Sequence, residues 1–230
     1  MDSRAMGICG GKVFFYVPGT QVGCLDAQTG KGLWSNTDGE TLKAIEDPRE
    51  GVATRFATDC AALCTERVLF LFPDMSKMVK PQMVALSAAD GKLLWKRERL
   101  AVEGYGGVFL FDEGKLLVAP PNYSKDPCVM LDPQTGQTMK ELPIRKYACA
   151  RVTACPDSIF FRDNGLGRYD KAQGKVVREN ATRPPCTDGA IPANGLLYLG
   201  PWCCRCNGLH GSEALCSAGD FRYDPVAKDE

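Results

Sequence analysis

The sequence has only one histidine, His210, among its 230 residues. This single histidine excludes a histidine-dependent nucleophilic triad, a histidine-rich metal site and an imidazole base anywhere else in the chain. The chain also lacks net charge, because 28 Lys and Arg balance 28 Asp and Glu. Its net charge therefore gives no overall electrostatic attraction to nucleic acid, an anionic membrane or an acidic substrate.

Long apolar runs are missing as well. No stretch approaches the roughly 18 apolar residues of a membrane span, so we expect none. The first seven residues lack the apolar core of a signal peptide. A β-rich run at 13–17 follows almost at once, which favours a piece of a longer protein. The content of hydrophobic residues, 44%, is that of an ordinary globular chain.

One turn motif recurs along the chain. An apolar residue is followed by a short polar residue, usually Asp, then after three residues by Gly, and then by a β-rich return strand, at residues 25–34, 86–95, 131–139 and 169–177. In such a turn Asp accepts hydrogen bonds from the following backbone N–H groups, and Gly adopts positive φ. We expect purely structural roles for its residues, namely Asp26, Gly30, Trp34, Gly91, Trp95, Asp132, Gly136, Asp170 and Gly174. The apolar residues of the return strands are expected to point into the core, namely Leu33, Leu94, Met139 and Val177.

The spacing of the motif indicates the fold. A β-rich run precedes each turn, and a fifth run at 196–200 begins another unit. Units of roughly 40 residues with about four strands are typical of propeller blades rather than helical repeats. The sequence thus predicts an all-β protein, a β-propeller with four to five four-stranded antiparallel blades. It is either an incomplete propeller that forms part of a larger one, or a small five-bladed propeller sealed by its cysteine-rich end. The blades are expected over 1–200, with a cysteine-rich C-terminal segment and tail over 201–230. Residues 38–46 can form a short helix within an insertion between blades, which we read as a solvated loop.

The turn with its aliphatic residue and Gly-Lys-x-x-Trp ending resembles the PQQ-like repeat of quinoprotein dehydrogenases and barrel-assembly lipoproteins. In that superfamily the Trp stacks between neighbouring blades. Trp34 and Trp95 match it, whereas Lys140 and Arg178 occupy the equivalent places. The segments at 4–11 and 183–189, with the cysteine-rich end, are similar to the C-terminal part of large planctomycete-type PQQ-like repeat proteins. The resemblance implies a bacterial, periplasmic or otherwise extracytoplasmic parent.

The resemblance does not imply that PQQ is bound, because related propellers serve as scaffolds. A quinoprotein holds Ca²⁺ beside the quinone with carboxylate and amide side chains. The Asp residues that can be placed here are explained by the turns, so the residues do not support PQQ.

The cysteine cluster after Trp202 admits several interpretations. Three thiolates and an imidazole match the ligands of a tetrahedral zinc site, from Cys203, Cys206, His210 and Cys216. Disulfides are the alternative in an oxidising compartment, including a vicinal Cys203-Cys204 ring. Covalent haem c is disfavoured, since Asn207 stands where Cys-x-x-Cys-His requires histidine.

Other cysteines among the twelve are also disulfide candidates. The candidates are Cys149, Cys155, Cys186 and Cys204. Cys60 and Cys64 can share one face of a helical turn, or they can simply pack in a core. Aromatic residues run at strand spacing and are expected to form inter-sheet core rather than base-stacking platforms, so no nucleic-acid binding is predicted.

Three functions remain open from the sequence. The first is a non-catalytic propeller module of an exported bacterial protein that holds other blades, neighbouring domains or protein partners. The second is part of a PQQ-dependent oxidoreductase with its catalytic residues on other blades. The third is a metal or redox module that uses the C-terminal cysteines.

Overall fold

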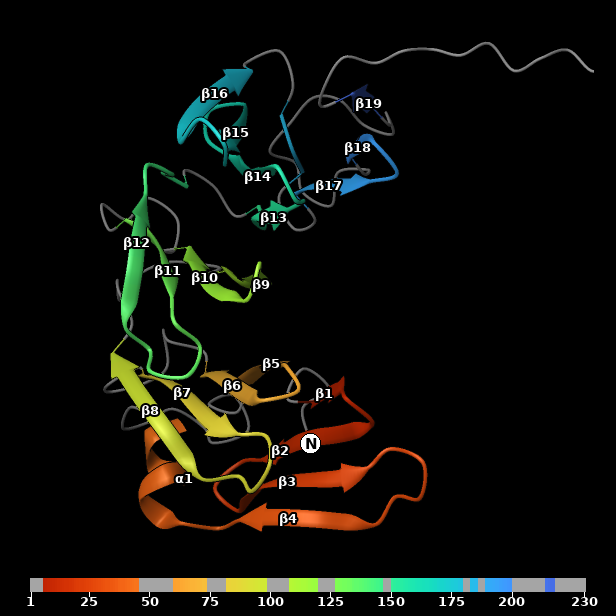
Figure 1. Ribbon diagram of the computed structural model, residues 1–230, viewed down its shortest axis with the longest axis vertical. Coiled ribbons are helices and arrows are strands. Elements are labelled where there is room, and N and C mark those ends of the chain that lie inside the picture. The colour runs from red at the N-terminus through yellow and green to blue at the C-terminus, as the bar shows by residue number, and fades with distance from the viewer. Residues whose placement is uncertain are drawn as a thin grey trace, which may run out of the picture. The chain divides into compact units, whose positions relative to one another are not determined.

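A computed structural model describes residues 6–45, 60–73, 82–98, 108–119, 127–146, 150–179, 183–185, 189–199 and 214–217. These residues form five antiparallel sheets, here called blades 1 to 5, in which each strand pairs with the next in sequence (Figure 1). The all-β fold predicted from the repeat is confirmed. The chain divides into two compact units, Met1–Leu142 with blades 1 to 3 and Pro143–Glu230 with blades 4 and 5.

The first unit contains three four-stranded blades. Blade 1 consists of β1 (Met6–Cys9), β2 (Lys12–Val17), β3 (Gln21–Asp26) and β4 (Gly32–Asn36). Blade 2 consists of β5 (Cys60–Cys64), β6 (Val68–Pro73), β7 (Gln82–Ser87) and β8 (Leu93–Glu98). Blade 3 consists of β9 (Val108–Asp112), β10 (Lys115–Ala119), β11 (Cys128–Leu131) and β12 (Thr138–Leu142).

The second unit contains a four-stranded blade and a sheet with three described strands. Blade 4 consists of β13 (Thr153–Ala154), β14 (Ser158–Arg162), β15 (Leu166–Asp170) and β16 (Lys175–Glu179). Blade 5 consists of β17 (Ala190–Ala193), β18 (Leu196–Leu199) and β19 (Ala214–Ser217). β19 lies within the predicted cysteine-rich segment and pairs with β18, with Cys216 opposite Leu197.

The core of the first unit lies between the faces of successive blades. Alternate residues of a strand point to opposite faces, so the middle strands serve two interfaces. In β6, Leu69 and Leu71 pack with Phe14 and Tyr16 of blade 1. Phe70 and its alternate neighbours pack with blade 3 residues such as Leu116. The strongly apolar middle strands are thus explained by burial on both faces.

The predicted helix is present as α1 (Gly39–Ile45). Asp38 caps it, since its Oδ2 accepts hydrogen bonds from the backbone N–H of Thr41 at 2.8 Å and from the Thr41 hydroxyl at 2.7 Å. Leu42 and Ile45 are buried in the core shared by blades 1 and 2. The helix is therefore part of the hydrophobic core, and the interpretation of this stretch as a solvated loop is wrong.

Two further expectations are also corrected. Leu33, Leu94, Met139 and Val177 are exposed rather than in the core, for example 47% for Leu33 and 54% for Met139. They lie on the outermost strand of each blade, which among the described residues pairs with only one other strand. The helical turn considered for Cys60 and Cys64 is the strand β5, where an i, i+4 pair also shares one face.

Among the helices of the described residues, none combines the length and the apolar character that crossing a membrane requires.

Candidate functional site: contacts between blades

The recurring turns are closed by their own side chains. We call them turn 1 (residues 26–30), turn 2 (87–91), turn 3 (132–136) and turn 4 (170–174). In turn 1, Asp26 Oδ1 accepts hydrogen bonds from the Gln28 N–H at 3.1 Å and from the N–H and hydroxyl of Thr29, both at 2.7 Å. The Thr29 hydroxyl, followed by the Thr29 backbone N–H, lowers the pKa of Asp26. The carboxylate is thus engaged within its own turn.

Turn 3 repeats this arrangement. Asp132 Oδ1 accepts from the N–H groups of Gln134 and Thr135, each at 2.8 Å, and from the Thr135 hydroxyl at 3.1 Å. These bonds, with the Thr135 N–H first, lower the pKa of Asp132. The structural roles predicted for both carboxylates are consistent with these bonds.

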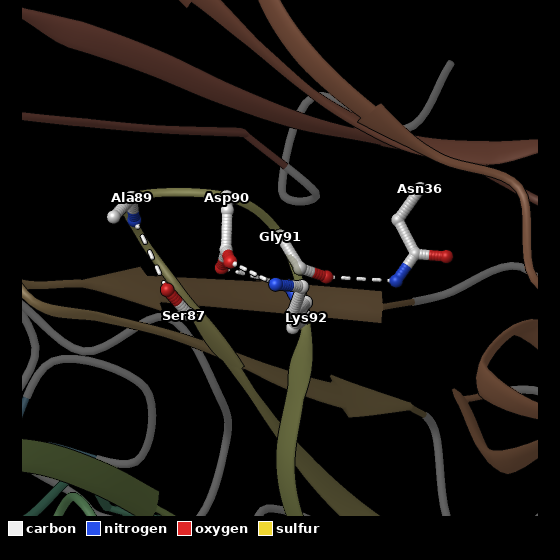
Figure 2. Close-up of polar contacts among 6 residues, drawn as sticks. All are labelled: Asn36, Ser87, Ala89, Asp90, Gly91 and Lys92. Atoms are coloured by element: carbon white, nitrogen blue, oxygen red, sulfur yellow. Dashed lines mark hydrogen bonds and ion pairs between the residues drawn. The ribbon is translucent and has the colours of Figure 1, made fainter.

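Turn 2 exchanges the two polar positions. Ser87 stands in the place of Asp26, and Asp90 stands in the place of Thr29. The Ser87 hydroxyl accepts a hydrogen bond from the Ala89 N–H at 3.3 Å, and Asp90 accepts one from the Lys92 N–H at 3.3 Å (Figure 2). Hydrogen bonds from the Ser87 hydroxyl and then from Lys92 lower the pKa of Asp90 to about 2. The hydroxyl and carboxylate are retained with their places swapped, which preserves the turn.

The first contact between blades is made by Trp34 of β4 on turn 2. Its indole N–H donates to the Ala88 carbonyl at 3.2 Å. The ring covers Gly91 so closely that a Cβ on this glycine would lie 2.5 Å from Trp34 Cε3. Asn36, two residues further on, donates its amide N–H to the Gly91 carbonyl at 2.7 Å (Figure 2). Trp34 also lies 6.0 Å from the ring of Phe14, measured between centroids.

The second contact repeats the first between blades 2 and 3. The Trp95 indole N–H donates to the Pro133 carbonyl at 2.9 Å. A Cβ on Gly136 would lie 2.6 Å from Trp95 Cδ2. Arg97 takes the role of Asn36 and donates to the Gly136 carbonyl at 2.8 Å. We call this combination of indole, turn carbonyl, glycine and following side chain the Trp–turn contact.

Blade 4 lacks the tryptophan of this contact. Arg178 of β16 stands at its position, and its Nε donates to Asp163 of the same blade at 2.5 Å. In turn 4, the Asp170 carboxylate accepts a hydrogen bond from the Gln173 N–H at 2.9 Å. The Arg178 guanidinium thus forms its ion pair with Asp163 inside blade 4. This agrees with the sequence, in which Arg178 departs from the tryptophan of the repeat.

None of the six cysteines whose side chains the structure describes forms a disulfide. Burial raises the pKa of Cys128 to about 12, and burial together with the neighbouring Cys9 thiol raises that of Cys64 to about 11. The Cys155 thiol donates a hydrogen bond to Asp157 Oδ1 at 2.9 Å, and burial, followed by this bond, raises its pKa. Protonated thiols are poor nucleophiles and poor metal ligands at neutral pH, so Cys64, Cys128 and Cys155 are expected to act as small packing residues.

Most of the predicted metal and disulfide residues lie outside the described residues. These are Cys149, Cys186, Cys203, Cys204, Cys206 and His210. Cys216 is placed in β19 by its backbone alone. The predicted zinc ligands and the disulfides of Cys149, Cys186 and Cys204 therefore stay predictions. Cys155, the fourth disulfide candidate, is a free thiol in the structure.

The described residues do not fit a calcium–quinone site. Within them, no three His, Cys, Asp or Glu side chains gather closely enough to hold a metal ion. The carboxylates of Asp26 and Asp132 accept hydrogen bonds inside their turns. The turn residues brought together by the fold thus build blade contacts rather than a cofactor site.

Sequence reasoning missed Asn36 and Arg97. They follow Trp34 and Trp95 by two residues, and residues two apart in a strand share a face. That spacing is the signal that could have identified them. The shared position is hard to recognise from residue types, because an amide and a guanidinium have in common only the N–H donor that bonds the glycine carbonyl.

Comparisons with known proteins agree with this architecture. The family model for the outer membrane protein assembly factor BamB matches residues 3–151. A search of curated proteins found no match.

Two solved structures are similar in fold. BamB from Moraxella catarrhalis has a TM-score of 0.52 at 14% identity over 84% of this chain and 53% of its own. The computationally designed Ika8 protein has a TM-score of 0.56 at 12% identity, with the same two coverages. The chain thus spans about half the length of these structures.

Proposed function

The chain belongs to the PQQ-like β-propeller repeat family, and from this premise we propose that it is a non-catalytic scaffold module. In this proposal its blades hold other blades, a neighbouring domain or a protein partner in a fixed position. The observation that carries the proposal is the repeated Trp–turn contact. The indole N–H groups of Trp34 and Trp95 donate to turns 2 and 3. The tryptophans that characterise the repeat therefore hold successive blades together.

The turn carboxylates support the same proposal. A catalytic base must reach a substrate proton, and a metal ligand must offer a lone pair to the ion. Asp26 and Asp132 direct their Oδ1 atoms at N–H groups of their own turns. They stabilise turns that the neighbouring blade contacts.

The test is a direct search for quinone chemistry. PQQ and Ca²⁺ are added to the purified chain, and we measure quinone absorbance, the reduction of an electron-accepting dye with alcohol as substrate, and the thermal midpoint. We expect no bound quinone, no dye reduction and an unchanged midpoint. Dye reduction that requires both the chain and PQQ would refute the scaffold proposal in favour of a PQQ-dependent oxidoreductase.

The proposal extends to location. We propose that the parent protein is bacterial and extracytoplasmic, and the family's description as an outer membrane assembly factor supports this. A planctomycete-type parent stays a prediction from the sequence. Export predicts disulfides among the cysteines beyond the six described ones, so a thiol count on the unfolded, unreduced chain from its native compartment should give fewer than the twelve thiols of the sequence. Twelve free thiols would contradict export.

A further inference from the structure

Two cysteines lie at the place where the innermost strands of blades 1 and 2 meet. Cys9 ends β1, Cys64 ends β5, and the two strands are in contact with each other (Figure 1). Both side chains pack against the core that the two blades share, and both are only partly buried. The pair therefore belongs to the interface between the blades and keeps some access to solvent.

Gly7 lets the Cys64 thiol come close to β1. A Cβ on Gly7 would lie 2.7 Å from Cys64 Sγ and 3.5 Å from Cys64 Cβ, so the thiol fills the space that a side chain would take. Further along, Gly10 lies against Glu66, where a Cβ would be 3.3 Å from Glu66 Cγ. Cys9 precedes Gly10 and shares one face of β1 with Gly7. The Cys64 thiol thus lies over the face of β1 that carries Cys9.

The electrostatics of Cys64 agree with this placement. Burial, followed by the neighbouring Cys9 thiol, raises the pKa of Cys64 to about 11. One thiolate opposes the ionisation of another only over a short distance, because water and salt screen more distant charges. The two thiols are therefore neighbours across the interface.

The register of the strands sets the other two cysteines of this core apart. Cys60 and Cys64 are four residues apart on β5, which separates their Cα atoms by about 13 Å. Cys24 is on β3, two strands away from β1, and its register places it in line with Gly7 rather than with Cys9. A disulfide requires Cα atoms within about 7 Å of each other. Cys60 therefore cannot pair with Cys64, and Cys24 cannot pair with Cys9.

We propose that Cys9 and Cys64 form a redox modification site, at which a small soluble disulfide converts the two thiols into a disulfide bond between blades 1 and 2. In the reduced chain the two cysteines pack as small side chains, and oxidation adds a covalent bond to the same contact. The inference goes beyond the scaffold function proposed above, because it concerns the chemistry of the interface and holds for any role of the blades.

The reaction is a thiol–disulfide exchange in two steps. One cysteine of the pair loses its proton, and its sulfur attacks the small disulfide, which breaks that S–S bond and releases one small thiolate. The sulfur of the second cysteine, after losing its proton, attacks the mixed disulfide, forms the Cys9–Cys64 bond and releases the second small thiolate. The two released thiolates take up the two protons. The cysteine pair is oxidised by two electrons, and the small disulfide is reduced by two.

Disulfide mapping tests the proposal on the full chain. The reduced, folded chain is incubated with glutathione disulfide, the remaining thiols are blocked with N-ethylmaleimide, and tryptic peptides are analysed by mass spectrometry. The Cys9 peptide, residues 5–12, should be linked to residues 56–67, which contain both Cys60 and Cys64. Fragmentation should place the link at Cys64 at least about tenfold more often than at Cys60, because adjacent thiols react far faster than separated ones.

Two matched variants of β5 identify the partner of Cys9. Cys60→Ala and Cys64→Ala each remove one thiol from the same face of the same strand. We expect the link to persist in Cys60→Ala and to be lost in Cys64→Ala. Unlinked Cys9 and Cys64, whether free or joined only to glutathione, would overturn the inference. So would a link to Cys60 as frequent as the link to Cys64, or a folded chain that forms the Cys9–Cys64 link no more often than a chain oxidised in urea.

Stability gives a second readout. The bond closes a long loop in the unfolded chain, so oxidation should raise the urea midpoint of tryptophan fluorescence by about 1 M or more. A thiol reductant should reverse the rise, which should be kept in Cys60→Ala and absent in Cys64→Ala. A link without a rise would show that the bond forms only by straining the interface, and it would overturn this site. Mapping identifies the linked pair itself, so its result is distinguished from the dye reduction and the thiol count that test the proposed function.

Discussion

At the residue scale, the glycines of the turns separate the cost of backbone conformation from the cost of packing. Gly30→Ala places a Cβ at positive φ in open space, which costs about 1 kcal/mol of unfolding free energy. Gly91→Ala has the same conformational cost and also places a methyl group against the Trp34 ring, which lowers the unfolding free energy by about 1 to 3 kcal/mol more. Urea unfolding of the two variants measures the difference.

A double-mutant cycle provides the control for this prediction. In a Trp34→Ala background the ring is gone, so Gly91→Ala should cost no more than Gly30→Ala does in the natural chain. An equal effect of Gly91→Ala with and without Trp34 would show that the indole does not press on the glycine.

Asp90 gives a prediction for pH. Its pKa in the folded chain is about 2, below the value near 4 of an unfolded aspartate. The ionised carboxylate therefore favours the folded state, and this contribution is present above pH about 4 and is lost as the pH falls toward about 2. Asp90→Asn should lose less stability than the natural chain between pH 4 and pH 2, measured by urea midpoints. Parallel curves for the two proteins would contradict the assignment.

The sequence alone predicted some of the hydrogen bonds in the turns and failed to predict others. The turn motif is local, so Asp26, Gly30 and Asp132 could be assigned from sequence. Turn 2 bonds the N–H groups of Ala89 and Lys92 with Ser87 and Asp90 exchanged, and the motif itself does not say which residue accepts which N–H group. Which carbonyl an indole reaches depends on how blades are stacked, and no local pattern contains that information.

At the scale of the element, the outer strands explain the wrong expectation for the return-strand residues. Alternation in a strand separates two faces but does not say how much of each face is covered. Trp95 of β8 is buried on blade 3, whereas its neighbour Leu94 is 38% exposed. The edge position of the strand decides this, and it becomes visible only when the sheet order is known.

This difference predicts two classes of substitution. Leu33→Thr and Met139→Thr remove apolar groups that are about half exposed and keep strand-favouring residues, so each should change the unfolding free energy by less than about 0.5 kcal/mol. Phe70→Ala empties a fully buried site between blades 2 and 3 and should cost about 3 to 5 kcal/mol. Thermal unfolding monitored by circular dichroism measures both. A large loss of unfolding free energy for Met139→Thr would show that the Met139 side chain is part of the core.

At the scale of the whole molecule, the two compact units are held by different interactions. Unit Met1–Leu142 contains both Trp–turn contacts and two apolar cores between blades. In the described residues of the second unit, Arg178 pairs within blade 4, and the apolar cluster that joins blades 4 and 5 is smaller. An ion pair with a half-exposed arginine adds little stability compared with a buried indole.

The second unit should therefore unfold at the lower urea concentration. In a Trp202→Phe variant all remaining tryptophan fluorescence comes from Trp34 and Trp95, and it reports only the first unit, whereas far-UV circular dichroism reports strands of both. We expect the dichroism change to begin before the fluorescence change, with the two curves ending together. Trp34→Ala should move the fluorescence midpoint down toward the first part of the dichroism curve. If both signals follow one coincident transition in the Trp202→Phe chain, the units fold as one cooperative body, and the Trp–turn contacts do not set the order of unfolding.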